Sequence, residues 1–291
     1  MFFDEEIILD LRLNILDKYV DKFVITEATY MHSGKPKKLI FDINKYSKFK
    51  DKIIYIPINE NPSGLMKINN DEDPTAKNNK KILNASKREL FQIEKTKEGI
   101  INADPDDIII VSDIDEIPNL ENTDFQKINT KLFFFKQKMF YYKFNLFYKQ
   151  MPWYGSKACK KKYFKSPTWL RSIKNKKYPK WRVDILFSNY KYNDIHYILD
   201  GGWHFTNIRT AEQLEKKMLN FLHHVDYEKS GIGLRELKNL MSEKKIMYDH
   251  RIDKKGLNKW GDGEKLIKVD LKDMPNHIKE NLDKYKLWLD I

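Results

Sequence analysis

The sequence has little of what disulfide-bonded, exported or membrane-spanning proteins need. Among its 291 residues there is one cysteine, Cys159, which excludes an intramolecular disulfide. No stretch approaches the roughly 18 consecutive apolar residues that a membrane-spanning helix requires. The beginning of the chain, Met1 to Glu6, is acidic where an export signal is basic. We therefore predict a soluble, cytoplasmic protein, although the composition is compatible with peripheral contact between a basic surface and a membrane.

Several glycine-containing signatures of catalysis and nucleotide binding are also missing. The chain has no Gly-x-Ser-x-Gly sequence, so nothing indicates a serine-hydrolase elbow. It has neither the Gly-x4-Gly-Lys-Ser/Thr pattern of a P-loop nor the Gly-x-Gly-x-x-Gly pattern of a dinucleotide-binding turn. Kinase-type and dinucleotide-type phosphate binding therefore lack support.

Positive charge, in contrast, is abundant. The 54 lysines and arginines outnumber the 42 acidic residues, which gives a net charge of +12. Such a field attracts polyanions, nucleotide-sugar diphosphates and anionic membrane surfaces. Much of the excess lies in residues 157–165 and 174–180, yet lysine is frequent everywhere and no nucleic-acid-binding module accompanies it. We expect no specific nucleic-acid partner, and a non-catalytic polyanion or nucleic-acid-binding protein stays as an alternative.

Hydrophobic periodicity predicts an α/β fold with one mostly parallel sheet, because strands and helices alternate early in the chain. A 3.6-residue apolar stripe predicts a helix over 4–18, and Thr210 with Gln213 forms a capping box that opens another. Pro275 is typical of the first turn of a final helix. The other predicted elements are strands at 22–28, 53–58, 108–111, 132–148, 183–188 and 195–199, a helix at 82–101, and loops at 59–81 and 149–180.

The most informative stretch is Asp113-Ile114-Asp115-Glu116, which follows the β-branched run 108–111. Such a run predicts a short strand buried on both faces, as in a parallel sheet, and ligands bind beyond the carboxyl ends of such strands. Extended backbone sends residues i and i+2 to the same side, so Asp113 and Asp115 can present carboxylates to one point. Two hard oxygen ligands suit Mg²⁺ or Mn²⁺ with phosphate oxygens in the open positions. The alternative is a solvated turn, which is common for so short a motif.

Other residues are weaker candidates for ligand binding. His204 follows a glycine pair and is a candidate third metal ligand, although a hydrogen-bonded buried histidine is the alternative. Trp203 can stack on a base or sugar, or pack in the core. Arg88 and Gln92 share one helix face, and an arginine fork suits a diphosphate unless it pairs with a surface carboxylate. Lys35 can reach phosphates or simply face water.

Six motifs occur in a fixed order along the chain: Asp21-Lys22-Phe23-Val24-Ile25-Thr26-Glu27-Ala28, Ser33-Gly34-Lys35-Pro36-Lys37, Asp51-Lys52-Ile53-Ile54, Arg88-Glu89-x-x-Gln92, Asp113-Ile114-Asp115-Glu116-Ile117-Pro118 and Gly202-Trp203-His204-Phe205-Thr206. This ordered set resembles family 17 of the glycosyltransferases, the group that contains β-1,4-mannosyl-glycoprotein β-1,4-N-acetylglucosaminyltransferase (N-acetylglucosaminyltransferase III). The resemblance covers roughly residues 3–225, and the ordered set is far more specific than any single member. Family members have a further strand ahead of the first helix, whereas this chain starts at Met1-Phe2-Phe3, so that strand is expected to be largely missing.

The resemblance implies a fold, a reaction and a division of the chain. The fold is the A-type glycosyltransferase (GT-A) fold, with a catalytic domain over 1–230 (donor half 1–118, acceptor half 119–230) and a packed C-terminal helical extension over 231–291. The reaction is inverting transfer of a sugar, GlcNAc in the known activity, from a UDP-sugar to a glycan or glycoprotein acceptor, with Mn²⁺ or Mg²⁺. The implied metal ligands are Asp113, Asp115 and His204, and the implied donor-binding residues are Glu27, Lys35, Arg88, Gln92, Asp113 and Trp203.

Inversion requires a carboxylate that accepts the proton of the acceptor hydroxyl. Glu116, Asp226 and Asp200 are candidates, and the sequence does not choose among them. Aromatic residues of 140–170, such as Trp153, Tyr154 and Trp169, form an acceptor wall or pack in the core. A haloacid-dehalogenase-type phosphohydrolase also uses Asp-x-Asp, but that family carries the motif on its first strand, not past residue 110.

Overall fold

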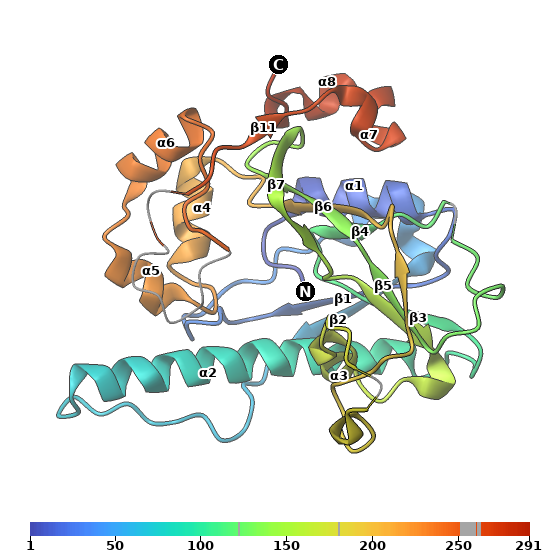
Figure 1. The fold of residues 1–291 in the computed structure, drawn as a ribbon. Helices are drawn as coiled ribbons and strands as arrows, with labels where there is room; N and C mark the ends of the chain where they lie inside the picture. The colour runs from blue at the N-terminus through green and yellow to red at the C-terminus, as the bar shows by residue number, and fades with distance from the viewer. Residues whose placement is uncertain (122, 180, 251–259, 261–262) are drawn as a thin grey trace.

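The computed structural model describes residues 1–121, 123–179, 181–250, 260 and 263–291. Lys180, from the predicted basic segment, and residues 251–259 and 261–262, from the predicted C-terminal extension, lie outside this described part. The fold is mixed α/β (Figure 1). The helices are α1 Glu6–Leu16, α2 Pro74–Lys95, α3 Pro167–Ser172, α4 Ala211–Met218, α5 His224–Ser230, α6 Leu234–Ser242, α7 Asn276–Glu280 and α8 Leu282–Tyr285. The strands are β1 Phe23–Ala28, β2 Ile53–Ile58, β3 Ile108–Val111, β4 Glu116–Pro118, β5 Leu132–Phe135, β6 Gln137–Tyr141, β7 Leu146–Trp153, β8 Lys157–Lys160, β9 Ile195–Ile198, β10 Gly202–Thr206 and β11 Ile267–Lys268.

The N-terminal part contains β1 and β2, which pair in parallel from Phe23 opposite Ile53 to Ala28 opposite Ile58. The long helix α2 runs below them in Figure 1. It begins at Pro74, eight positions before the predicted start, because Asp73 accepts hydrogen bonds from the first-turn amides and proline fits the first turn. Residues 1–3 run beside β1, with the Phe2 amide donating to the Thr26 carbonyl at 2.8 Å.

The remaining strands form two sheets, in the orders β11-β7-β6-β10-β4 and β3-β8-β5-β9. The prediction of a mostly parallel sheet is wrong for the described residues, where three of the eight strand pairings are parallel. In particular, β3 lies at a sheet edge and pairs antiparallel with β8, and only Ile109 of its four residues is buried. The reason is that residues 132–160 fold back on themselves as β5, β6, β7 and β8, which supply antiparallel partners that periodicity alone does not specify.

Two further predictions are corrected by the structure. The predicted loop over 149–180 contains the end of β7, all of β8 and helix α3. The predicted strand over 183–188 is a 3₁₀ turn at Val183–Ile185, followed by residues that pair with no strand. Asp184 accepts two hydrogen bonds from the Arg182 guanidinium, which closes the chain into a turn instead of an extended segment.

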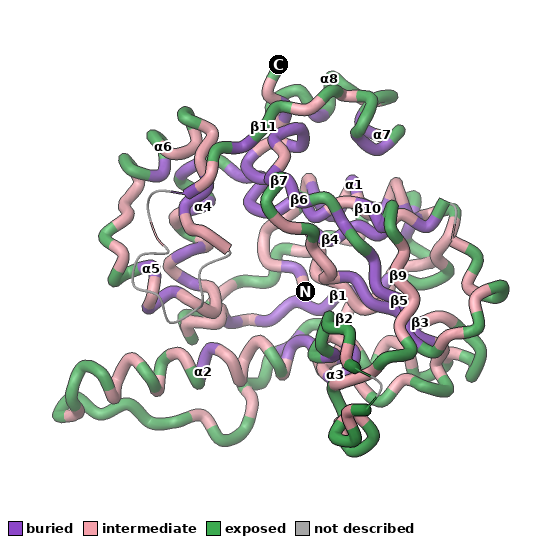
Figure 2. The backbone as a smooth tube through the Cα atoms, viewed as in Figure 1, coloured by how far each residue is buried: buried purple, intermediate pink, exposed green. Residues whose placement is uncertain are grey.

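The largest hydrophobic core joins α1 to the strands on both sides of it, and buried backbone follows the central strands in Figure 2. The C-terminal residues Met274, Ile278, Tyr285 and Leu289 are buried in this same core, and β11 pairs with β7. The division at residue 230 stays a prediction. In the described part of the chain, no helix has both the length and the apolar character needed to span a bilayer.

Candidate active site

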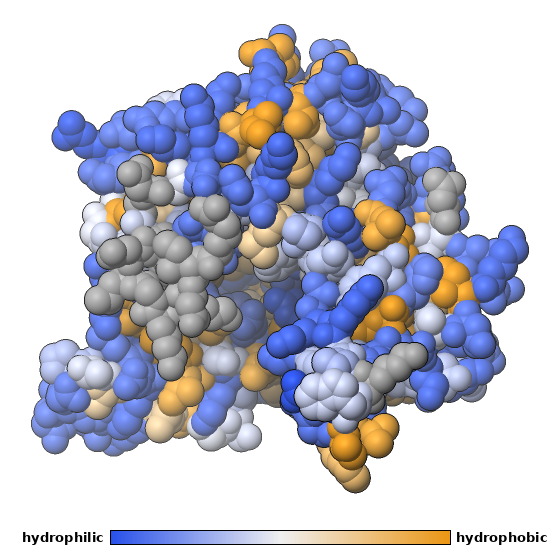
Figure 3. All heavy atoms as spheres, in the orientation of Figure 1, coloured by the Kyte–Doolittle hydropathy of each residue, from blue (hydrophilic) through white to orange (hydrophobic). Residues whose placement is uncertain are grey.

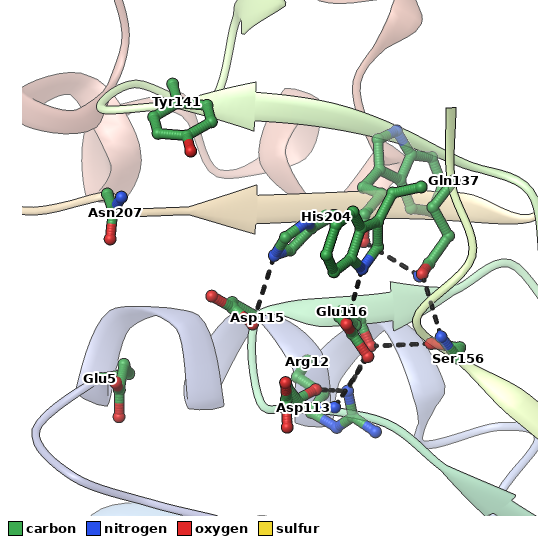
Figure 4. A network of polar contacts seen from close by, with 12 residues as sticks. Glu5, Arg12, Asp113, Asp115, Glu116, Gln137, Tyr141, Ser156, His204 and Asn207 are labelled. Carbon is green, nitrogen blue, oxygen red and sulfur yellow. Dashed lines mark hydrogen bonds and ion pairs between the residues drawn. The ribbon is translucent and has the colours of Figure 1, made fainter. Parts of the chain in front are cut away.

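The Asp-x-Asp segment forms the turn between β3 and β4 and is fixed from below by α1. Nη1 of Arg12 donates to the carbonyls of Asp113 (3.1 Å) and Glu116 (2.6 Å) (Figure 4). Its Nη2 donates to Ser112 Oγ (2.6 Å). Burial lowers the pKa of the Arg12 guanidinium to about 10, although the neighbouring carboxylates oppose this, so Arg12 stays charged at neutral pH. A helix side chain therefore sets the backbone path of the turn.

Strand pairing brings His204 to the same turn. In the antiparallel pair of β4 and β10, His204 lies opposite Glu116, and the Phe205 amide donates to the Asp115 carbonyl at 2.8 Å. His204 Nε2 lies 3.6 Å from Asp115 Oδ1. Burial opposes ionisation of both groups, but their mutual attraction outweighs it, so the pKa of Asp115 is lowered and that of His204 is raised.

Asp113 has a different partner. Its carboxylate forms an ion pair with Nη1 of Arg171 on α3, whose Nη2 lies 3.9 Å from Glu89 on α2. Burial would raise the pKa of Asp113, but the Arg171 guanidinium more than offsets this and holds it below its ordinary value. Both aspartates therefore have lowered pKa values, and each lies beside a basic side chain contributed by a distant segment, Asp113 beside Arg171 and Asp115 beside His204.

Glu116 points to the other side of the turn and is buried. One carboxylate oxygen accepts from Trp153 Nε1 at 2.6 Å and the other from the Asp113 amide at 2.9 Å. Burial, and then the charge of Asp113, raise the pKa of Glu116. The Trp153 ring in turn stacks on His204, with ring centroids 4.8 Å apart. A side chain at Gly155 would collide with Glu116 and Trp153, so it would displace the hydrogen-bonded pair that they form.

A pocket of about 220 Å³ opens beside Asp113 and Asp115. Four carboxylates line it against two lysines, and the one lining histidine, His32, has its pKa lowered to about 4 by burial and is therefore neutral. The wall is acidic even though the whole chain carries a charge of +12. The lining residues are Met1, Phe2, Phe3, Glu5, Ala28, Tyr30, Met31, His32, Lys37, Glu89, Gln92, Asp113, Ile114, Asp115, Lys217, Asn220, Phe221 and Leu222.

Some of the predicted donor-binding residues lie at this pocket and others do not. Gln92 lines it together with the two aspartates. Lys35 is exposed and does not line it, whereas Lys37, two residues later, does. Arg88 does not line the pocket but supports a residue that does, because its guanidinium donates to the His32 carbonyl at 3.2 Å. It also donates to Asn61 Oδ1 at 3.1 Å.

The other predicted residues lie outside the pocket lining. Trp203 extends from β10 and donates its indole N–H to the Asp273 carbonyl at 3.3 Å. Asp200 is exposed and accepts from the Asn119 side chain at 3.3 Å. Asp226 on α5 lies 3.5 Å from His223 Nδ1. Of the aromatic residues proposed as an acceptor wall, Trp153 contacts Glu116 as described above, Tyr154 packs edge-on against Tyr197, and Trp169 is buried.

Glu27 is fully buried and does not line the pocket. Its carboxylate pairs with Lys37 and accepts from the amides of Ile40 (2.9 Å) and Phe41 (3.0 Å) and from the Tyr55 hydroxyl (2.9 Å). These contacts hold the segment 37–41 against β1 and β2. Glu27 thereby positions Lys37, which does line the pocket.

We expect Glu27→Gln to lower the free energy of unfolding by about 3 kcal/mol, because an amide cannot accept from all four donors and leaves Lys37 unpaired. Urea unfolding measures this, with Glu280→Gln, an exposed position, as the control. Unchanged stability together with a raised KM for a sugar donor would instead place Glu27 in direct contact with the donor.

The donors beside the pocket suit a divalent cation. Among the described residues, no group of three His, Cys, Asp or Glu side chains could hold a metal. Mg²⁺, however, is usually bound by one or two carboxylates together with substrate phosphates and water. The 3.6 Å between Asp115 and His204 is near the roughly 3 Å that separates neighbouring ligands at about 2.1 Å from one ion. His204 Nδ1 is buried and has no hydrogen-bond partner among the described residues.

Sequence reasoning missed Arg12 and Arg171. Arg12 contacts Asp113 from 101 positions away and Arg171 from 58 positions away, so no local pattern links them to the turn. One signal was available for Arg12, which stands between Leu11 and Leu13 in a helix, both of which are completely buried. A charged residue enclosed by apolar neighbours indicates a specific polar partner.

Comparison with known proteins finds one matching family. The family model of glycosyltransferase family 17 matches residues 1–289, which is nearly the whole chain and extends beyond the motifs that suggested it. No curated protein and no solved structure matches at a significant level. The match over the full length identifies the chain as a member of glycosyltransferase family 17.

Proposed function

We propose that the protein is a metal-dependent inverting glycosyltransferase of the GT-A type, which moves a sugar, GlcNAc in our assignment, from a UDP-sugar to a glycan or protein-linked acceptor. The observation that carries this proposal is the acidic pocket at Asp113 and Asp115 in a chain of net charge +12. Carboxylates alone would repel a diphosphate, so the pocket suits a diphosphate that arrives with a divalent cation.

We assign different roles to the residues around the pocket. Asp115 and His204 are our assigned protein ligands, and the bound ion would neutralise charge on the departing UDP. Arg171 and Lys37 place further positive charge at the pocket. Arg12 keeps the turn in register through the two carbonyls that it binds.

Three observations bear on our choice of the carboxylate that accepts the proton. Neither Asp200 nor Asp226 lines the pocket, and both oxygens of Glu116 already accept hydrogen bonds. This arrangement suits Glu116 as a brace that fixes the Asp113 amide and the Trp153 ring. Glu5 and Glu89 are the two pocket carboxylates outside the Asp-x-Asp segment.

Hydrolysis and transfer assays with a panel of UDP-sugars and Mn²⁺ test the proposal. We expect turnover of one donor, loss of turnover with EDTA and recovery on addition of Mn²⁺. Failure of every UDP-sugar to bind by calorimetry, with Mn²⁺ present, would overturn it. Aryl phosphate hydrolysis that Asp113→Asn abolishes would favour the phosphohydrolase, and salt-sensitive DNA binding that survives Asp113→Ala/Asp115→Ala would favour the polyanion binder.

A further inference from the structure

A cluster of large apolar side chains lies open to solvent far along the chain from the pocket residues. Within residues 181–187, which we name the tip, Trp181 is 79% exposed, Val183 63%, Leu186 81% and Phe187 85%. The loop that carries them projects below α3 in Figure 1, and apolar side chains appear at the corresponding lower end of the surface in Figure 3. A contiguous exposed cluster of this kind marks an interaction site more often than a chance arrangement.

The tip has a defined shape. Asp184 accepts from the Arg182 guanidinium at 2.8 and 2.7 Å and from Lys191 Nζ at 2.7 Å, and the Leu186 amide donates to the Val183 carbonyl at 3.0 Å. These contacts close the turn and leave the apolar side chains facing outward. The turn therefore holds these apolar side chains in contact with solvent.

The base of the loop is anchored to α3. Trp169 Nε1 donates to the Asn189 carbonyl at 2.8 Å, and the Lys174 amide donates to the Tyr190 carbonyl at 2.8 Å. Helix α3 also carries Arg171, the partner of Asp113. The tip thus belongs to the same supporting element as one side of the candidate active site.

Positive charge is concentrated in the segments next to the tip in the sequence. Residues 174–191 contain six lysines and arginines and one acidic residue, Asp184. Lys174, Lys176 and Lys177 are exposed, and none of them forms an ion pair with a described residue. Apolar side chains at a protruding end, together with cations in the neighbouring segments, are complementary to a partner that has an anionic outer layer and an apolar interior.

We propose that the tip docks on an anionic lipid bilayer, with Trp181, Leu186 and Phe187 entering the headgroup region and Lys174, Lys176 and Lys177 facing the acidic lipids. The proposal is independent of the sugar-transfer assignment. A protein partner would more often meet a flat or concave patch with a polar rim, whereas this cluster is convex and the segments around it are predominantly basic.

Vesicle sedimentation tests the docking. The wild-type protein is expected to bind vesicles of phosphatidylcholine with phosphatidylglycerol, to bind phosphatidylcholine alone far less, and to lose binding as salt rises. Trp181→Ser/Leu186→Ser/Phe187→Ser should weaken binding by at least about tenfold, and Lys174→Glu/Lys176→Glu/Lys177→Glu by at least about 100-fold.

Matched controls remove equivalent groups elsewhere. Ile101→Ser/Leu287→Ser takes away side chains that are 70% and 80% exposed, and Lys149→Glu/Lys279→Glu/Lys286→Glu reverses three exposed lysines. Weakening by a control as large as that by its tip counterpart would overturn the proposal, because attraction would then be general. Absence of vesicle binding would also overturn it.

A site-specific probe separates lipid contact from protein contact. Cys159 is completely buried, so Phe187→Cys provides the one accessible thiol for a polarity-sensitive dye among the described residues. A blue shift of its emission on addition of anionic vesicles is the expected result. A concentration-dependent dimer in sedimentation velocity that the tip variant dissociates, with no shift on vesicles, would show that the tip is a contact between copies of the chain instead.

Discussion

Replacing Asp115 with asparagine is expected to lower donor turnover by about 1,000-fold, with little change in the fold. The side chain keeps its size but loses the charge that attracts a divalent ion beside His204, 3.6 Å away. Loss of one preorganised electrostatic contact at a developing charge typically costs about 100- to 1,000-fold in rate. Initial rates with saturating Mn²⁺ and UDP-sugar measure the effect, and circular dichroism checks the fold.

The matched control for this variant is Asp283→Asn, an exposed aspartate on α8 away from the pocket. It should leave turnover within about twofold of the wild-type rate, as surface substitutions generally do. If Asp115→Asn kept full turnover that EDTA still abolished, the ion would have to be held by other groups.

Replacing Arg12 with methionine is expected to lower the free energy of unfolding by about 2–4 kcal/mol and to reduce turnover as well. Methionine keeps the hydrophobic stem but leaves the Asp113 and Glu116 carbonyls and Ser112 Oγ without the donors that now bind them. An unsatisfied buried acceptor costs about 1–3 kcal/mol. Urea unfolding monitored by tryptophan fluorescence measures the loss of stability.

Two further variants are needed to interpret the result for Arg12→Met. Arg235→Met removes an exposed arginine from α6 and should change stability by less than about 0.5 kcal/mol. Arg12→Lys keeps the charge but loses the fork that reaches three acceptors, so it should recover only part of the stability. Full recovery by lysine would show that charge alone, and not the bridge across the turn, is what the position requires.

Local signals predicted the elements whose formation depends on nearby residues. The apolar stripe of α1, the strands β1, β2 and β9 and the capping box at Thr210 are confirmed. The pairing of strands could not be predicted in this way. Strand β3 pairs with β8, almost 50 positions later, through contacts that produce no periodic pattern in the sequence. Apolar content likewise suggested a strand at 183–188, although those side chains find no partner sheet and remain exposed.

The same distinction between local and long-range contacts applies to the candidate site. The alternation of side chains along extended backbone was enough to group Asp113 with Asp115, and both line one pocket. The basic side chains that pair with them come from α3 and β10, and the arginine that bridges the backbone of the turn comes from α1. Only the three-dimensional fold brings these segments together, which explains why no local pattern singled out Arg171 and Arg12. The donor-binding roles of Lys35 and Trp203 stay predictions.

Anomalous diffraction from crystals grown with UDP and Mn²⁺ would examine the proposed site without relying on catalysis. We expect one manganese peak within about 2.3 Å of an Asp115 oxygen, with diphosphate oxygens completing the coordination and the nucleotide in the pocket bordered by Gln92 and His32. A nucleotide bound elsewhere on the surface, or a manganese ion that contacts neither aspartate, would contradict the proposed role of the Asp-x-Asp turn in holding the metal and the diphosphate.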